Sequence, residues 1–191
     1  MAKVHTGIDK LIIIGGSAGS LEPLIGILSA LPSGYPHPIV VVLHRKASDD
    51  DLLATLLTHK TALEVRAAED KDALSTLGIF LAPGDYHLLF EADGTMALDE
   101  SEKIAFSRPS IDVSFQSAAA IYGSSLICIL LSGANADGTE GLLEVRKNGG
   151  LSISQLPASA RVPFMPKHAI DHHAADKVMD IPAIAGFLLD L

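Results

Sequence analysis

Short apolar runs rich in β-branched residues alternate along the chain with longer stretches whose apolar residues recur every three or four positions. The first pattern is typical of buried strands in a parallel sheet, and the second of amphipathic helices. The predicted strands cover residues 11–14, 39–43, 63–67, 79–81, 126–131 and 151–154. The predicted helices cover residues 20–31, 50–59, 110–122, 139–147, 165–173 and 181–191. Strand and helix alternating at this spacing predict a doubly wound, Rossmann-like α/β fold, in which a mostly parallel sheet is flanked by helices on both faces.

Turn and cap residues add detail to this fold. The step Asp93-Gly94 lies between two short strand-like runs, 87–90 and 95–98, and predicts an added β-hairpin. Ser20 is the predicted N-cap of the first helix, because its hydroxyl suits the free N–H groups at a helix start. Three aspartates, Asp49 to Asp51, suit the N-terminal end of the second helix.

Length and composition narrow the class of protein. The 191 residues suffice for one sizeable core, so we expect a single domain over residues 1–191. The longest strongly apolar run, 126–131, is far shorter than the about 20 residues that cross a bilayer, and residues 1–7 lack a secretory signal. A cytoplasmic location is therefore expected. The net charge of -9 argues against a nucleic-acid partner, and the only cysteine, Cys128, is expected to be a small buried hydrophobic side chain.

Three side chains able to carry chemistry follow three different predicted strands. Ser17 comes after the first strand, His44 after the second, and Asp137 lies in the loop that follows strand 126–131. Because the carboxyl ends of parallel strands share one edge of a sheet, these residues can meet in one crevice. A serine becomes an effective nucleophile when an imidazole takes its proton and a carboxylate orients the imidazole. We therefore predict Ser17, His44 and Asp137 as the catalytic triad of a hydrolase.

The segment from Gly15 to Gly19 fits the pattern G-x-S-x-G, in which small neighbours allow a serine to occupy a sharp strand-to-helix turn. The backbone N–H groups of Ala18 and Gly19 are the predicted donors to an oxyanion. Each element alone has a simpler reading: a glycine turn that packs on a helix, a packing histidine at position 44, and a turn aspartate at position 137. Phosphate-binding loops do not fit, because position 17 is serine and no Gly-Lys-Ser/Thr follows. The prediction of a catalytic triad therefore rests on the occurrence of all three residues together, each just after a different predicted strand.

The other histidines offer weaker sites. His87 follows a turn-like segment, and His168, His172 and His173 lie in a C-terminal helical region without the cysteine or carboxylate pattern typical of zinc. We expect neither a metal nor a cofactor.

Taken together, the motifs resemble the catalytic domain of the chemotaxis protein-glutamate methylesterase family, CheB. Ile14 to Gly19 resembles the family pattern around the nucleophile, His44 follows a strand as the family histidine does, and Asn135 to Gly138 resembles the aspartate loop. The segment from Leu81 to His87 is similar to the family segment A-P-G-D-x-H. The segment from Arg108 to Val113 is similar to the family segment R-P-S-V-D-V. The resemblance runs from about residue 11 to residue 170 and rests on five ordered motifs.

This resemblance implies a serine hydrolase that removes the methyl ester from glutamate γ-methyl esters on the cytoplasmic helices of chemoreceptors. Ser17 is then the nucleophile, His44 the base and Asp137 the carboxylate that orients the base. The resemblance also implies glutamine deamidation, which uses the same acyl-enzyme. Neither reaction requires a cofactor. Full-length members carry an N-terminal receiver domain. Because this chain begins almost at the first catalytic strand, we expect no receiver domain.

Several positions differ from the usual family pattern and bear on the substrate. Ala18 stands where threonine is usual, Arg45 and Lys46 stand in place of Met-Pro after the histidine, and Ala134 replaces methionine in the aspartate loop. Two alternative functions follow. One is an esterase that acts on a different protein or on a small ester, favoured if Arg45 and Lys46 have rebuilt the cleft. The other is a catalytically silent interaction module with the same fold.

Overall fold

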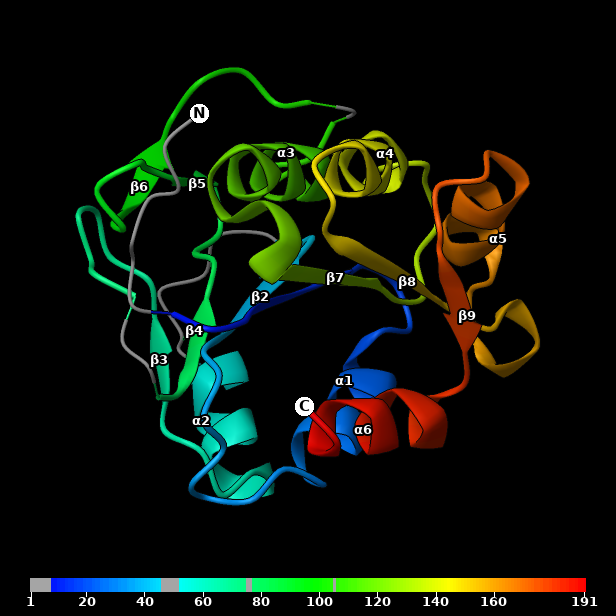
Figure 1. The fold of residues 1–191 in the computed structure, drawn as a ribbon, viewed down its shortest axis with the longest axis horizontal. Helices are drawn as coiled ribbons and strands as arrows, with labels where there is room; N and C mark the ends of the chain where they lie inside the picture. Colours follow the sequence, from blue (N-terminus) through cyan, green and yellow to red (C-terminus); the bar gives the residue numbers. More distant parts are fainter. Residues whose placement is uncertain (1–7, 46–51, 75–76, 105) are drawn as a thin grey trace.

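The computed structural model describes residues 8–45, 52–74, 77–104 and 106–191. Within these residues the main sheet has seven parallel strands in the order β3-β4-β2-β1-β7-β8-β9 (Figure 1). The strands are β1 Leu11–Gly16, β2 Ile39–Leu43, β3 Val65–Ala67, β4 Ile79–Leu81, β7 Leu126–Leu130, β8 Leu151–Gln155 and β9 Lys177–Met179. The predicted fold class is therefore confirmed, with six of these strands at predicted places.

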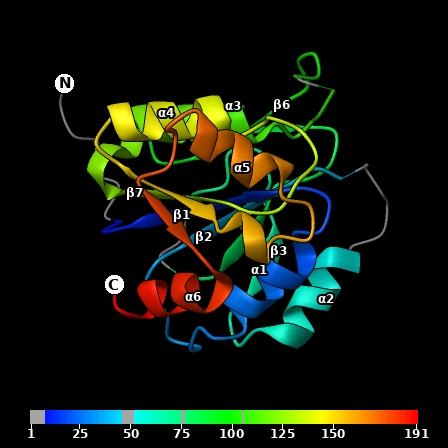
Figure 2. The ribbon, with the colours of Figure 1, turned by 90° about the vertical axis from the view of Figure 1, so that its right-hand side faces the viewer.

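Helices cover both faces of the sheet, which lies between two helical layers in Figures 1 and 2. One layer contains α1 Leu21–Leu28, α2 Leu52–Lys60 and α6 Ile181–Leu189. The other contains α3 Ile111–Tyr122, α4 Thr139–Lys147 and α5 Phe164–Asp171. Two short 3-10 helices, Gly123–Ser125 and Pro157–Ser159, complete the helical segments of the described residues. None of the helices described is long and apolar enough to span a membrane.

The core consists of two hydrophobic clusters, one on each face of the sheet. Successive side chains of a strand point to opposite faces, so Ile12 and Ile14 join the cluster under α1, α2 and α6, whereas Leu11 and Ile13 join the cluster under α3, α4 and α5. All four of these side chains are fully buried. A strand buried on both faces explains why the sequence shows a continuous apolar run there rather than an alternating one.

The predicted hairpin is also confirmed. Strands β5 His87–Phe90 and β6 Met96–Asp99 pair antiparallel and form a sheet of their own. The hairpin packs against α3, where the Ser114 hydroxyl donates to the Leu88 carbonyl at 2.8 Å.

Three local features of the fold lie beyond the successful predictions. Strand β9 was not predicted, because three residues at an exposed edge carry too little periodicity. Ser20 does precede α1, but the prediction that its side chain caps the helix is wrong: its hydroxyl donates instead to the Ser17 carbonyl at 2.6 Å. The prediction for Asp49 to Asp51 lies outside the described residues.

The strand order places a topological switch point at the centre of the sheet. From β1 the chain moves first toward β2 and β4, and later returns to add β7 and β8 on the other side of β1. In open α/β sheets, ligands bind outside the carboxyl ends of the strands at such a point. The segments that follow β1, β2 and β7 therefore define where a site is expected.

Candidate active site

The segments that hold the three predicted site residues meet at this switch point. Gly16 is in register with Leu43, so Ser17 and His44 leave adjacent strands side by side. The His44 N–H donates to the Gly16 carbonyl at 3.1 Å, and the Ser17 N–H donates to the Ser132 carbonyl at 2.9 Å. Hydrogen bonds of the main chain thus fix Ser17 between the end of β2 and the loop that leads from β7 to Asp137.

Ser17 lies in a tight turn between β1 and α1. The Ser20 N–H and the Ser20 hydroxyl both donate to the Ser17 carbonyl, at 3.1 Å and 2.6 Å, and Gly19 adopts a positive φ of 78°. Glycine adopts such a backbone conformation at little cost. The described residues provide no acceptor for the N–H groups of Ala18 and Gly19. These donors sit at the start of α1, where a developing negative charge is favoured.

Glycine at position 15 is required by the close approach of α3. A Cβ atom there would lie 2.5 Å from Cγ2 of Ile111, a fully buried side chain. We predict that Gly15→Ala lowers the free energy of unfolding by about 1–3 kcal/mol, because Ile111 has to move within a packed core. Chemical denaturation of the variant and of the wild-type protein measures this difference in the free energy of unfolding. Gly34→Ala is the matched control: no atom lies within 4 Å of its Cβ position, and a change beyond about 0.5 kcal/mol is not expected.

His44 and Asp137 are joined by a short hydrogen bond. The distance from His44 Nε2 to Asp137 Oδ2 is 2.7 Å, and the two side chains are 11% and 0% exposed. Asp137 also accepts hydrogen bonds from the Ser110 hydroxyl and from the N–H groups of Ile111, Asp112 and Gly138, all within 3.0 Å. Burial opposes the charge of this carboxylate, but the hydrogen bonds from His44, Asp112 and Ile111 outweigh it and lower the pKa of Asp137. Asp137 is therefore an ionised group held rigidly at the N-terminus of α3.

A second carboxylate, Asp112, lies beside Asp137 at the start of α3. Its Oδ1 accepts a hydrogen bond from the Gly141 N–H at 2.6 Å, so it ties α3 to α4. Burial and the neighbouring charge of Asp137 raise the pKa of Asp112 to about 7. Near neutral pH, Asp112 can thus hold a proton while Asp137 keeps its charge.

This raised pKa predicts a pH dependence of stability. The folded protein retains the Asp112 proton between the ordinary pKa of 3.8 and about 7, whereas the unfolded chain releases it, so this residue's contribution to stability falls as pH rises through that window. Asp112→Asn keeps an acceptor for Gly141 and cannot ionise. We expect the wild-type protein to lose stability relative to this variant between about pH 4 and pH 7, with a constant difference at higher pH. Urea denaturation at several pH values measures it, and a pH-independent difference contradicts the prediction.

The second ring nitrogen of His44 faces a serine that was not predicted. The Ser107 hydroxyl lies 3.3 Å from His44 Nδ1, whereas no hydrogen bond of the described residues joins the Ser17 hydroxyl to His44. Because Nε2 carries the hydrogen shared with the ionised Asp137, Nδ1 is the basic nitrogen. Among the described residues, the serine hydroxyl that reaches this imidazole is therefore that of Ser107. No sequence signal points to Ser107, since it lies in an irregular segment just before Arg108.

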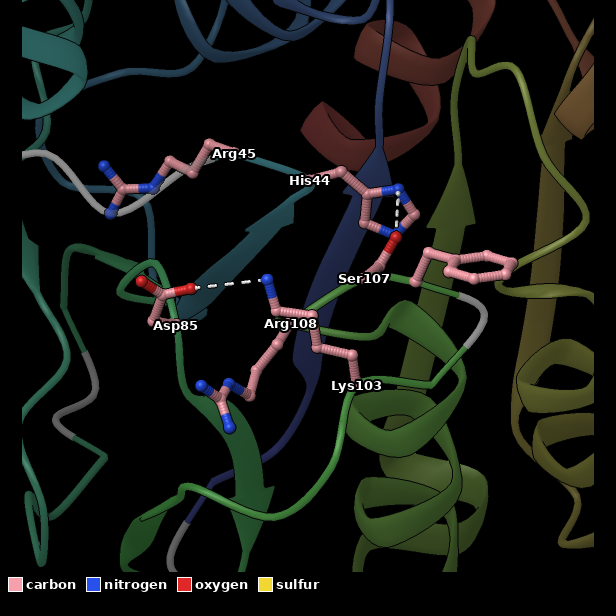
Figure 3. Close-up of a pocket in the computed structure, with 7 residues that line it drawn as sticks. His44, Arg45, Asp85, Lys103, Ser107 and Arg108 are labelled. Atoms are coloured by element: carbon pink, nitrogen blue, oxygen red, sulfur yellow. Dashed lines mark hydrogen bonds and ion pairs between the residues drawn. The ribbon is translucent and has the colours of Figure 1, made fainter.

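Figure 3 shows a pocket that opens beside this imidazole. It encloses about 600 Å³ and is lined by His44, Arg45, Asp85, Lys103, Phe106, Ser107 and Arg108. Arg45, one of the positions that differ from the usual family pattern, is therefore part of the wall. Lys46, the differing position next to it, lies outside the described residues.

The weaker histidine candidates do not converge on this site. His87 is buried, and its Nδ1 accepts from the Ser110 N–H at 3.1 Å, so it supports the residue that in turn contacts Asp137. His168, in α5, stacks on His172, which follows that helix, and the His168 Nδ1 lies 2.9 Å from the Thr139 hydroxyl. The described residues contain no group of three or more His, Cys, Asp or Glu side chains that could hold a metal ion. Cys128 is fully buried, as predicted, and burial raises the pKa of its thiol.

Sequence and structure comparisons agree with this architecture. Residues 12–188 match the model of the family described as CheB methylesterase. A solved structure, the Thermotoga maritima CheB methylesterase catalytic domain, superposes with a TM-score of 0.91 at 36% identity, covering 95% of this chain and 97% of that one. The chain belongs to the CheB methylesterase family.

Curated relatives carry one shared description. A Leptospira interrogans protein, provisionally named a protein-glutamate methylesterase/protein-glutamine glutaminase, is 38% identical over 95% of this chain and 94% of its own length. The Rhodospirillum rubrum and Thermotoga maritima proteins with that name are each 36% identical over 95% of this chain, which spans 50% and 54% of their lengths. The chain therefore matches nearly all of one relative and about half of the others.

Proposed function

We propose that this chain is a cytoplasmic protein-glutamate methylesterase that hydrolyses glutamate γ-methyl esters on the cytoplasmic helices of chemoreceptors. Membership of the CheB methylesterase family and the shared name of the relatives support the reaction. The observation that carries the proposal is the 2.7 Å hydrogen bond between His44 and the buried Asp137 at the sheet edge where Ser17 emerges.

In the proposed reaction, Ser17 is the nucleophile and His44 the general base. His44 Nδ1 takes the hydroxyl proton as Ser17 Oγ attacks the ester carbonyl, and Asp137 stabilises the imidazolium through Nε2. The N–H groups of Ala18 and Gly19 stabilise the oxyanion. His44 then gives the proton to the leaving methoxide, which departs as methanol. Water deprotonated by His44 attacks the acyl-enzyme, releases the glutamate carboxylate and restores Ser17.

The same acyl-enzyme supports the glutaminase activity that the relatives' name includes. A glutamine amide in place of the ester yields ammonia as the leaving group, and the second half of the reaction is unchanged. We propose this as a second substrate of the same site.

Methanol release from a methylated receptor fragment tests the proposal. Hydrolysis that depends on Ser17 is expected. Turnover of small aryl esters without any release of methanol from the fragment would instead favour an esterase with another substrate. Absence of both activities, in a folded protein that still binds a receptor fragment, would favour the silent interaction module.

A further inference from the structure

One apolar side chain that lines the pocket beside His44 is almost completely exposed. Phe106 is 98% exposed, whereas the other exposed large hydrophobic side chains of the described residues range from 39% to 68%. A single apolar side chain in water is common on protein surfaces, so this exposure alone decides nothing. The position of Phe106 is more informative, because the pocket that it lines opens beside the imidazole of the proposed base.

The turn that carries Phe106 is held in place by hydrogen bonds. The N–H groups of Ile104 and Ser107 donate to each other's carbonyls, at 3.2 Å and 2.9 Å, and close a tight turn that contains Phe106. Directly after this turn, Arg108 Nη1 donates to the Ser101 carbonyl at 2.8 Å. The aromatic side chain thus extends into solvent from a fixed support, so a ligand that contacts it has little loop ordering to bring about.

The backbone of Phe106 adopts an unfavourable conformation. Its φ of 64° lies in the left-handed region, which is costly for a residue with a bulky side chain. Glycine and asparagine adopt this conformation more readily. Strained residues of this kind persist where the surrounding structure holds them, and they cluster at sites of ligand contact. An aromatic side chain therefore stands where the local backbone favours a smaller residue.

The same turn contacts the base of the proposed triad. The Ser107 hydroxyl lies 3.3 Å from His44 Nδ1, and Phe106 is the residue directly before Ser107. Consecutive Cα atoms are about 3.8 Å apart, and side chains three and four positions apart on a helix start about 5–6 Å from each other. A substrate helix that brings its ester to His44 therefore places a neighbouring side chain of the same face within reach of the Phe106 ring.

We propose that Phe106 is a substrate-binding residue, which packs against an apolar side chain three or four positions from the methyl ester on the substrate helix. The inference rests on the proposed function and deepens it, because it names a feature by which this site selects its substrate. The contact removes the uncharged ring from water, and exposed aromatic side chains often supply much of the binding energy between proteins.

A pair of helical peptides tests this contact. Each carries one glutamate γ-methyl ester, with leucine in one peptide and alanine in the other at the positions three and four residues from it. Both residues are strong helix formers, so the peptides differ mainly in apolar area. We expect the wild-type protein to show a kcat/KM about tenfold higher for the leucine peptide, mainly through KM, because the contact is remote from the reacting carbonyl. The preference should persist at high salt, which screens charges but does not weaken apolar contacts.

Three variants of Phe106 separate the ring from the backbone beneath it. Phe106→Ala should move the ratio of the two kcat/KM values toward one. Phe106→Asn, which suits the positive φ, should do the same, whereas Phe106→Tyr keeps the ring and should keep the preference. Hydrolysis of N-acetylglutamate γ-methyl ester, which has no neighbouring side chains, should fall much less in Phe106→Ala than hydrolysis of the leucine peptide.

Leu189→Ala is the matched control. It removes an apolar side chain that is 50% exposed at the end of α6, in the helical layer opposite α3, and should leave the ratio unchanged. Partial unfolding of any variant scales the rates for both peptides together and does not alter the ratio.

The outcomes distinguish failure of this inference from failure of the proposed function. Equal kcat/KM values for the two peptides in the wild-type protein overturn the role of Phe106 and leave the methylesterase proposal standing. A preference that survives both Phe106→Ala and Phe106→Asn also overturns it. So does a ratio of one combined with a lower molar mass of Phe106→Ala in sedimentation equilibrium, since the ring then joins two copies of the chain. If neither the peptides nor the small ester releases methanol while the protein remains folded, the proposed function itself fails.

Discussion

Replacing Ser17 with alanine is expected to lower the rate of methyl-ester hydrolysis by about 10⁴-fold or more, the loss typical of a missing triad member. The reason is geometric: Ser17 leaves β1 beside His44, at a turn whose Ala18 and Gly19 N–H groups are unpaired within the described residues. Steady-state methanol release from a methylated receptor fragment measures the loss in kcat.

Two comparison variants sharpen this prediction. Ser29→Ala removes an exposed hydroxyl after α1 and should leave kcat unchanged. Ser107→Ala removes the hydroxyl that lies 3.3 Å from His44 Nδ1 and is expected to cost far less than Ser17→Ala, because Ser107 lacks the free N–H groups of the β1–α1 turn. The reverse order of effects would make Ser107 the nucleophile and contradict the assignment of Ser17.

The second large effect is expected for Asp137→Asn. An amide at this position no longer stabilises the imidazolium or the tautomer with a hydrogen on Nε2, and a loss in kcat of about 10⁴-fold follows. Stability should fall as well, because Asp137 accepts hydrogen bonds from the N–H groups of Ile111, Asp112 and Gly138. An amide can satisfy only part of this set, and a buried unpaired donor costs about 1–3 kcal/mol. Kinetics and urea denaturation of one sample measure both effects.

The pH dependence of this second effect has a definite sign. Because the pKa of Asp137 is lowered in the folded protein, its charge stabilises the fold above the ordinary aspartate pKa, and this contribution is lost as pH falls through the lowered value. The stability difference between wild type and Asp137→Asn should therefore shrink in strong acid. Asp190→Asn, which changes an exposed carboxylate after α6, is the matched control. A loss of stability without a loss of kcat would show that Asp137 only caps α3.

The sequence was most informative where one physical constraint dominates. Strands such as β1 and β7 are buried on both faces, so their continuous apolar runs revealed them, and the topology then brought Ser17, His44 and Asp137 to one edge. Local hydrogen bonding was less predictable. The Ser20 hydroxyl has a choice of partners at the turn, and only the three-dimensional path of the chain shows that the Ser17 carbonyl is the one it meets.

The contacts around His44 were likewise not predictable from the sequence. Ser107 approaches His44 from 63 residues away, through an irregular segment with no periodic pattern. Asp112 stands in a segment that the family resemblance singles out, but its raised pKa depends on burial and on the nearby Asp137, which lies beyond the end of α3 in sequence. Contacts of this kind depend on how loops pack, which neither composition nor spacing encodes.

The most direct test of the account is to locate the serine that a fluorophosphonate probe modifies. Mass spectrometry of the digested, labelled protein should find the adduct on Ser17, and labelling should be lost in Ser17→Ala and strongly slowed in His44→Ala. An adduct on Ser107, or labelling of Ser17 at the same rate without His44, would contradict the proposed catalytic arrangement.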